Sequence, residues 1–293
     1  GVVDGDHWVG LGTDLRAALE ACTDLMAAGL VTRKETIGDK EWTTGMIGTG
    51  KGFRQAYGYW EARIRFTSRD GMWSAFWMQS PTMGNPIGSP NSAGTEIDIC
   101  EHRTIDGSGS NIDGLVVGNI HWDGYGAAHR SHGYDSGNLG LGTGYHIYGM
   151  EWTPTQQKFY INGILRLTIN NNAANSPVSQ RSEFIILSSE VDDTSTTWAG
   201  AIPAAGYGTL ATTTTKMTVD YVRVYRRSET VVNETGGNEV NSSRTSDGMF
   251  FGRGELPICQ RIEERIIKRR KLLIVDLHAQ RFKRRAHGFR LFR

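Results

Sequence analysis

The chain has 293 residues, of which 38% are hydrophobic, 10% aromatic and 22% charged. This aromatic content excludes a wholly disordered chain, and no apolar run approaches the roughly 18 residues that a membrane-spanning helix needs. The three cysteines are too few and too scattered for a disulfide framework or a zinc knuckle.

The net charge of +1 combines two regions of opposite sign. Residues 258–293 hold 12 basic and 3 acidic residues, whereas residues 1–257 hold 20 basic and 28 acidic residues. We therefore interpret an acidic body and a basic tail separately. The tail could bind a nucleic acid or another anionic surface. No regularly spaced stacking aromatics accompany its arginines, however, so no nucleic-acid partner is expected.

The first thirty residues do not have the plan of a signal peptide, because charged residues interrupt the segment that would be its apolar centre. Export is therefore either absent or directed by a signal that preceded this sequence. Residues 14–28 are rich in Ala and Leu at helical spacing, and they end before Gly29. This pattern predicts a short amphipathic helix.

From residue 29 onward, β-branched and aromatic residues cluster in short runs bounded by turn residues. No long helix separates these runs, so we predict an all-β fold of two packed antiparallel sheets. Asn162-Gly163 predicts a two-residue hairpin turn. The predicted strands are 30–35, 45–49, 57–66, 72–79, 95–101, 115–122, 146–152, 158–161, 164–169, 184–189 and 216–226. We expect one domain over 1–227, a polar linker over 228–257, and a basic tail of unknown role over 258–293.

The segment richest in chemistry holds three carboxylates within six residues, at Glu96, Asp98 and Glu101. Side chains alternate along a strand, so Glu96 and Asp98 share one face, while strict alternation would bury Glu101 in the core. A β-bulge at Ile99-Cys100 would return Glu101 to the face of the other two. Two carboxyls about 5–5.5 Å apart are what a retaining glycosidase requires, as nucleophile and acid/base. The alternative interpretation is a solvated acidic edge strand.

Aromatic and polar residues on the predicted neighbouring strands favour a sugar site. Trp73 and Trp77 lie on one face of their strand and could stack on sugar rings, although two buried core tryptophans are the alternative. Asn119 and His121 share a face of another strand, and His121 is either structural or part of the site. Arg63 is a candidate substrate contact or a residue of the sheet edge.

At these residues the chain resembles glycoside hydrolase family 16. The run from Glu96 to Glu101 is similar to that family's bulged E-x-D-x-x-E signature, and the clear resemblance covers about residues 43–226. The resemblance implies a β-jelly-roll sandwich of two antiparallel sheets, similar to concanavalin A, and it implies endo-hydrolysis with retention. It further implies that Glu96 is the nucleophile, Asp98 the assisting carboxylate and Glu101 the acid/base. The other similar motifs are at 57–65, 72–77, 146–152 and 219–225.

The same resemblance sets the remaining expectations. A polysaccharide is the expected partner, no membrane partner is expected, and a secreted or periplasmic monomer is implied. No cofactor is required, but a structural calcium is possible, with Asp220 as one ligand. The acidic body favours a β-glucan with 1,3 or mixed linkages over a sulfated galactan. Agarase or carrageenase activity, transglycosylation and a catalytically silent sugar-binding sandwich stay open as alternatives.

Overall fold

The computed structural model describes residues 8–10, 30, 32–37, 40–172, 175–191, 198–208, 212–213 and 215–227. The chain divides into two units, 1–229 and 230–293, and the second unit lies outside the described residues. The predicted helix over 14–28 also lies outside them, as do the whole of the predicted linker and the whole basic tail. No helix among the described residues is long and apolar enough to cross a membrane.

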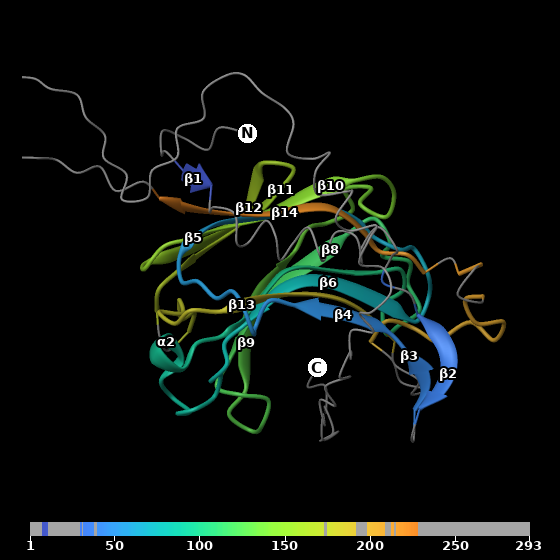
Figure 1. The fold of residues 1–293 in the computed structure, drawn as a ribbon, viewed down its shortest axis with the longest axis horizontal. Coiled ribbons are helices and arrows are strands. Elements are labelled where there is room, and N and C mark those ends of the chain that lie inside the picture. Colours follow the sequence, from blue (N-terminus) through green and yellow to red (C-terminus); the bar gives the residue numbers. More distant parts are fainter. Residues whose placement is uncertain are drawn as a thin grey trace, which may run out of the picture. The chain divides into compact units, whose positions relative to one another are not determined.

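Two six-stranded antiparallel sheets form the first unit, and they face each other across the core (Figure 1). The first, called here the β5 sheet, has the order β1 (Trp8–Gly10), β14 (Thr218–Arg227), β5 (Gly58–Arg65), β10 (His146–Trp152), β11 (Gln156–Ile161) and β12 (Ile164–Asn170). The second, the β7 sheet, has the order β4 (Gly45–Gly48), β13 (Phe184–Val191), β6 (Met72–Gln79), β7 (Glu96–Arg103), β8 (Val116–Trp122) and β9 (Arg130–Asp135). A small hairpin of β2 (Arg33–Ile37) and β3 (Lys40–Thr43) and a short helix α2 (Pro90–Ala93) complete the described elements.

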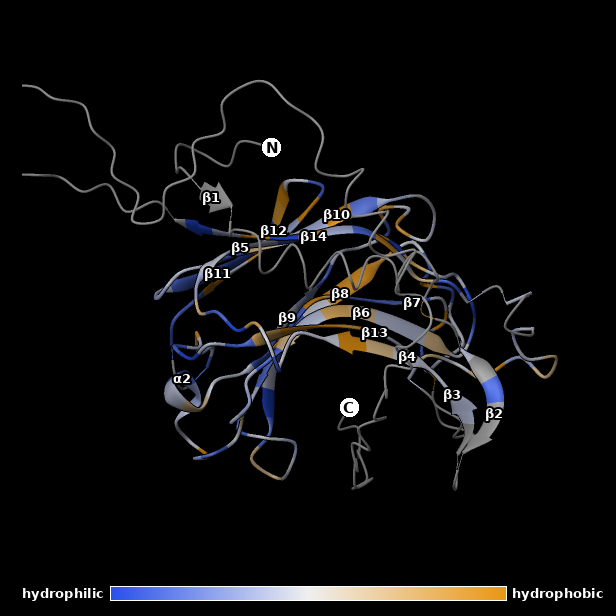
Figure 2. Ribbon diagram, in the orientation of Figure 1, coloured by the Kyte–Doolittle hydropathy of each residue, from blue (hydrophilic) through white to orange (hydrophobic). Residues whose placement is uncertain are grey.

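Side-chain alternation places one face of each sheet in the shared core. In β5, Trp60, Ala62 and Ile64 are fully buried, and the intervening residues face away from the core. In β6, Phe76 and Met78 occupy the core. Figure 2 shows the resulting apolar stretches in β6 and β8. The two-sheet fold predicted from the strand pattern is therefore confirmed.

Most of the predicted strands match observed ones, and the two at 72–79 and 146–152 have the observed bounds of β6 and β10. The predicted hairpin turn is also confirmed, because Asn162 and Gly163 both have positive φ angles, 50° and 77°. The sequence did not predict β9, whose residues Arg-Ser-His-Gly-Tyr-Asp are polar and mostly exposed at the edge of the β7 sheet. Such an edge strand carries no apolar alternation.

Candidate active site

The bulge predicted in β7 is present. Asp98 pairs with Asn119 of β8, and the next paired residue, Glu101, faces Val117, so Ile99 and Cys100 together stand opposite Gly118. Both Ile99 and Cys100 point into the core, where they are 1% and 0% exposed. The inserted residue therefore returns Glu101 to the outer face that carries Glu96 and Asp98.

Gly118 lies opposite the bulge and has no room for a side chain. A Cβ added at Gly118 would lie 2.4 Å from a ring carbon of Tyr134 and 3.1 Å from the Asp98 carbonyl oxygen. The ring of Tyr134 on β9 therefore fills the space that a side chain would need at this position of β8. The glycine and the bulge are thus two parts of one packing arrangement.

Strand register brings the predicted site residues together on the outer face of the β7 sheet. Across β6 and β7, Glu96 pairs with Gln79 and Asp98 pairs with Trp77. Across β7 and β8, Glu96 pairs with His121, while Asn119 pairs with Asp98. The carboxylates therefore lie in the middle of this sheet, with aromatic and amide side chains on one side and imidazole and amide side chains on the other.

Glu96 lies under a tyrosine from the loop after β8. The hydroxyl of Tyr125 donates a hydrogen bond to the Glu96 carboxylate and lies 3.1 Å from Oε1 of Gln79. Glu96 is 7% exposed, whereas Tyr125 is 59% exposed. An exposed side chain thus covers a nearly buried carboxylate, and a ligand on this face would meet Tyr125 before it met Glu96.

Asp98 contacts His121, which in turn pairs with a second histidine, His129. Nε2 of His121 lies 3.1 Å from Oδ2 of Asp98, and Nδ1 of His121 lies 3.0 Å from Nε2 of His129. The two imidazoles are stacked, with ring centroids 5.1 Å apart. Burial lowers the pKa of His129, and the neighbouring His121 lowers it further. The histidine that the sequence left as either structural or functional therefore lies against the central carboxylate.

Glu101 differs electrostatically from an ordinary surface glutamate. Burial raises the pKa of its carboxyl well above the usual value, and the negative charges of Asp98 and Glu96 raise it further. Nδ2 of Asn119 donates to Oε2 of Glu101 at 3.4 Å. A glutamate whose pKa is raised in this way is suited to protonate a leaving group, and here it lies beside two further carboxylates.

The two sheets, the bulged strand and the order of its carboxylates can be compared with known proteins. The family model described as "Glycosyl hydrolases family 16" matches residues 24–223. This chain belongs to glycosyl hydrolase family 16.

Individual relatives are distant in sequence but cover the same region. The clotting factor G alpha subunit of Tachypleus tridentatus is 28% identical over 209 residues, which are 69% of this chain and 27% of that protein. A beta-glucanase of Rhodothermus marinus is 28% identical, and the alignment covers 66% of each chain. The X-ray structure of an endo-beta-1,3-glucanase from Pyrococcus furiosus has a TM-score of 0.52 at 27% identity, covering 68% of this chain and 74% of that one. The chain thus spans about a quarter of the length of the Tachypleus relative.

Both predicted tryptophans of this family 16 chain lie on the outer face beside the carboxylates. Trp73 and Trp77 are half-buried and stand outside the core cluster. The indole nitrogen of Trp77 donates to the hydroxyl of Ser188 at 3.1 Å. Trp73 contacts Trp198 edge to face, with ring centroids 5.9 Å apart. The alternative that both tryptophans are core residues is therefore wrong.

A shallow depression of about 380 Å³ adjoins the carboxylates on the side of Glu101. Trp198 and Arg103 form one wall, where the guanidinium of Arg103 lies 3.5 Å from the centroid of the Trp198 ring. Asn119, which donates to Glu101, is also part of the lining. The remaining lining residues are Val117, Gly133, Tyr134 and Asp135. The depression thus combines an exposed aromatic face with polar groups next to the acid.

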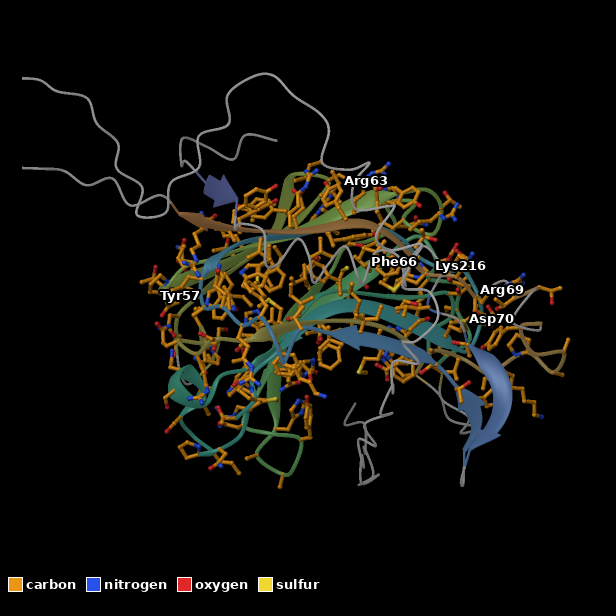
Figure 3. The ribbon with its side chains drawn as sticks, in the orientation of Figure 1. Tyr57, Arg63, Phe66, Arg69, Asp70 and Lys216 are labelled. Carbon is orange, nitrogen blue, oxygen red and sulfur yellow. The ribbon has the colours of Figure 1, made fainter. Side chains whose placement is uncertain are left out.

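Two predicted residues lie away from this site. Arg63 is on β5 of the other sheet, and Figure 3 places it on the outer side of that sheet, whereas Phe66 points between the sheets. Nη1 of Arg63 lies 2.6 Å from Oδ2 of Asp220 on β14, and its guanidinium lies over the ring of Tyr145. Strand alternation in β5 thus directs Arg63 away from the β7 sheet, while a substrate contact stays a prediction.

The same ion pair bears on the predicted calcium. A calcium ion is bound by oxygen ligands, but the carboxylate of Asp220 contacts a guanidinium instead. Among the described residues, the only close group of three possible metal-ligating side chains is Glu96, Asp98 and His121, which does not include Asp220. The described surroundings of Asp220 do not fit a calcium site, and no step of the chemistry below depends on one.

Sequence reasoning missed several residues that complete the site. Tyr125 and His129 belong to the segment between β8 and β9, where the sequence shows only turn residues around Asp123-Gly124. Trp198 lies in a loop after β13, outside any strand, so strand alternation says nothing about where its side chain points. Their only signal was their residue type, because each reaches the site through a loop whose path the strand pattern does not specify.

Proposed function

We propose that this chain is a retaining endo-β-glycosidase that hydrolyses β-glucans with 1,3 or mixed linkages. The observation that carries the proposal is the bulged β7 strand, which presents Glu96, Asp98 and Glu101 on one face, where burial and like charge raise the pKa of Glu101. Membership of glycosyl hydrolase family 16 supports the same reaction class.

In the first step, a carboxylate oxygen of Glu96 attacks the anomeric carbon, and the glycosidic C–O bond breaks. Glu101 transfers its proton to the departing oxygen, so the leaving sugar departs as a neutral alcohol. The products of this step are a covalent glycosyl ester of Glu96 and an ionised Glu101. Asp98 supports the role of Glu101 as the acid, because its negative charge raises the pKa of the Glu101 carboxyl.

In the second step, the ionised Glu101 takes a proton from water as the water oxygen attacks the anomeric carbon. The ester bond to Glu96 breaks, and the sugar leaves with its original anomeric configuration. Retention requires the two glutamate carboxyls to lie about 5–5.5 Å apart, and this separation stays a prediction. A sugar hydroxyl in place of water would give transglycosylation through the same intermediate.

Three observations support a glucan as substrate. The Rhodothermus and Pyrococcus relatives are called a beta-glucanase and an endo-beta-1,3-glucanase. The acidic residues of the body disfavour attraction to sulfated galactans. Trp73, Trp77 and Trp198 offer aromatic faces for sugar rings near the carboxylates.

We further propose that the protein is a monomer and acts in a secreted or periplasmic location, where polysaccharides are accessible.

The test is a product profile with laminarin, lichenan, agarose and carrageenan, made with the full chain and with Glu96→Ala. We expect oligosaccharides from laminarin or lichenan, with the β-anomer formed first, and no turnover by the variant. Cleavage of agarose or carrageenan alone would replace the substrate class. A Glu96→Ala variant with a rate near that of the parent would refute the role of Glu96. Binding of glucan without cleavage by the parent would favour the sugar-binding alternative.

A further inference from the structure

One buried acid of the β7 sheet has no part in the reaction described above. Glu183 lies directly before β13 and is 0% exposed. Its backbone pairs with Gln55, since the N–H of each residue donates to the carbonyl oxygen of the other at 3.1 Å. A buried glutamate is costly unless neighbouring groups satisfy it, so its contacts indicate what it does.

Strand register places Glu183 on the core side of the sheet, behind Glu96. Phe184 of β13 pairs with Gln79 of β6, which pairs with Glu96 of β7. One residue along the same strands, the N–H of Ser80 donates to the carbonyl oxygen of Thr95 at 2.9 Å. Because side chains alternate, the row that includes Glu183 and Thr95 faces the core, whereas Glu96 faces the site.

The carboxyl of Glu183 spans the end of β6 to reach the residue before Glu96. Its Oε1 accepts hydrogen bonds from the backbone N–H of Thr95 at 2.9 Å and from the Thr95 hydroxyl at 3.1 Å. Both donors of one residue are thus held by one oxygen. Thr95 is itself fully buried, so no water competes for these hydrogen bonds.

The protonation of Glu183 suits this position. Burial raises its pKa to about 8, hydrogen bonds from Thr95 and Ser179 oppose this rise, and the charge of Glu96 adds to it. At neutral pH most molecules therefore carry an uncharged acid here, and no second negative charge stands behind Glu96. Its other oxygen, Oε2, is buried and has no hydrogen-bond partner within normal geometry among the described residues, so the short hydrogen bonds of this carboxyl are those from Thr95 to Oε1.

We propose that Glu183 is a positioning residue that fixes Thr95, and through it the carboxylate of Glu96, from the core side of the sheet. The inference rests on the proposed function, in which Glu96 is the nucleophile. A displacement of about 1 Å at a reacting group can cost about a hundredfold in rate. Loss of the Thr95 hydrogen bonds would therefore lower kcat more than it changes substrate binding.

The experiment compares Glu183→Gln, which keeps an acceptor oxygen without a charge, with Glu183→Leu, which keeps bulk but cannot accept. Gln157→Leu is the matched control, because Gln157 is a fully buried polar side chain of β11 in the other sheet. Each variant of the full chain is assayed on laminarin for kcat and KM per folded molecule. Circular dichroism gives the folded fraction and Tm.

We expect Glu183→Leu to lower kcat by about tenfold or more, with KM little changed, and Glu183→Gln to restore most of the rate. Gln157→Leu should keep the parental kcat. If Glu183→Leu lowers only Tm, or if Glu183→Gln loses as much rate as the leucine variant, the positioning role is refuted.

Should Glu183→Leu fail to fold, Thr95→Val provides the same test, since it removes one of the two donors without burying a charge. It should lower kcat in the same direction, and an unchanged kcat would overturn the proposal. The two proposals are distinguishable. An active Glu96→Ala variant would refute the nucleophile, whereas an inactive Glu96→Ala with an unaffected Glu183→Leu would refute only the positioning role.

Discussion

Strands β7 and β14 each carry one extra residue, but the consequences differ. In β14 the register shifts between Val219 and Tyr221, and the extra residue, Asp220, binds Arg63 of the neighbouring strand. In β7 the register shifts between Asp98 and Glu101, and the inserted residue turns into the core. A bulge by itself only redirects side chains, and the groups around it decide whether the result is structural or reactive.

The surroundings of the two bulges differ in charge and in exposure. The side chains of Arg63 and Asp220 are 38% and 49% exposed, and an ion pair in water contributes about 0–1 kcal/mol. Around Glu101, burial and two like charges raise the pKa of the carboxyl. The exposed ion pair of opposite charges stabilises the fold only slightly. The like charges around Glu101 instead raise the pKa of its carboxyl, which favours the form that can donate a proton.

The largest effect should come from the Glu101 carboxyl at the β7 bulge. We expect Glu101→Gln to lower kcat on laminarin by about 10²–10⁴-fold, because the departing oxygen loses its proton donor. An aryl glycoside whose leaving group needs no proton should lose much less rate in the first step. Equal losses on both substrates would show that Glu101 is not the acid.

The packing of the β7 bulge should be sensitive to the facing glycine. Gly118→Ala would place a methyl group against Tyr134 and should destabilise the fold by about 1–3 kcal/mol, as overpacked cores do. Urea denaturation measures this change. Gly52→Ala is the control, because a Cβ there would meet nothing within 4 Å. Equal stability of the two variants would contradict the close packing at the bulge.

The like charges at the β7 bulge predict a shift in the pH profile. Asp98→Asn removes the negative charge that raises the pKa of Glu101 more than the charge of Glu96 does. This pKa should therefore fall, although burial still holds it above the usual value. The alkaline limb of kcat/KM, where Glu101 loses its proton, should move to lower pH. Glu190→Gln, which removes a weaker contributor, should move it less. If the alkaline limb does not move, it reports the ionisation of a group other than Glu101.

The smallest effects are expected at the β14 bulge. Arg63→Leu should change the free energy of unfolding by less than about 1 kcal/mol and leave kcat and KM on laminarin unchanged, because the pair is exposed and lies on the outer side of the β5 sheet. Thermal unfolding and initial rates measure both. A clear rise in KM would instead identify Arg63 as a substrate contact.

Much of this site could be predicted because it depends on a period of two within short segments. Glu96 and Glu101 are five positions apart and cannot share a face without an insertion, so the sequence required the bulge. The same alternation separated Trp77 from Phe76. Each of these conclusions concerns one strand, whose side chains are ordered by covalent geometry alone.

The tertiary structure decided what lies across from those strands. Arg63 has the residue type of a substrate contact, yet its strand belongs to the opposite sheet. Tyr125 reaches Glu96 from a loop, and Glu183 reaches Thr95 across another strand. The sequence by itself determined most of the strands, the bulge and the order of the carboxylates. Which sheet each strand joined, and which distant side chains came to cover or support Glu96, depended on long-range packing that no local period encodes.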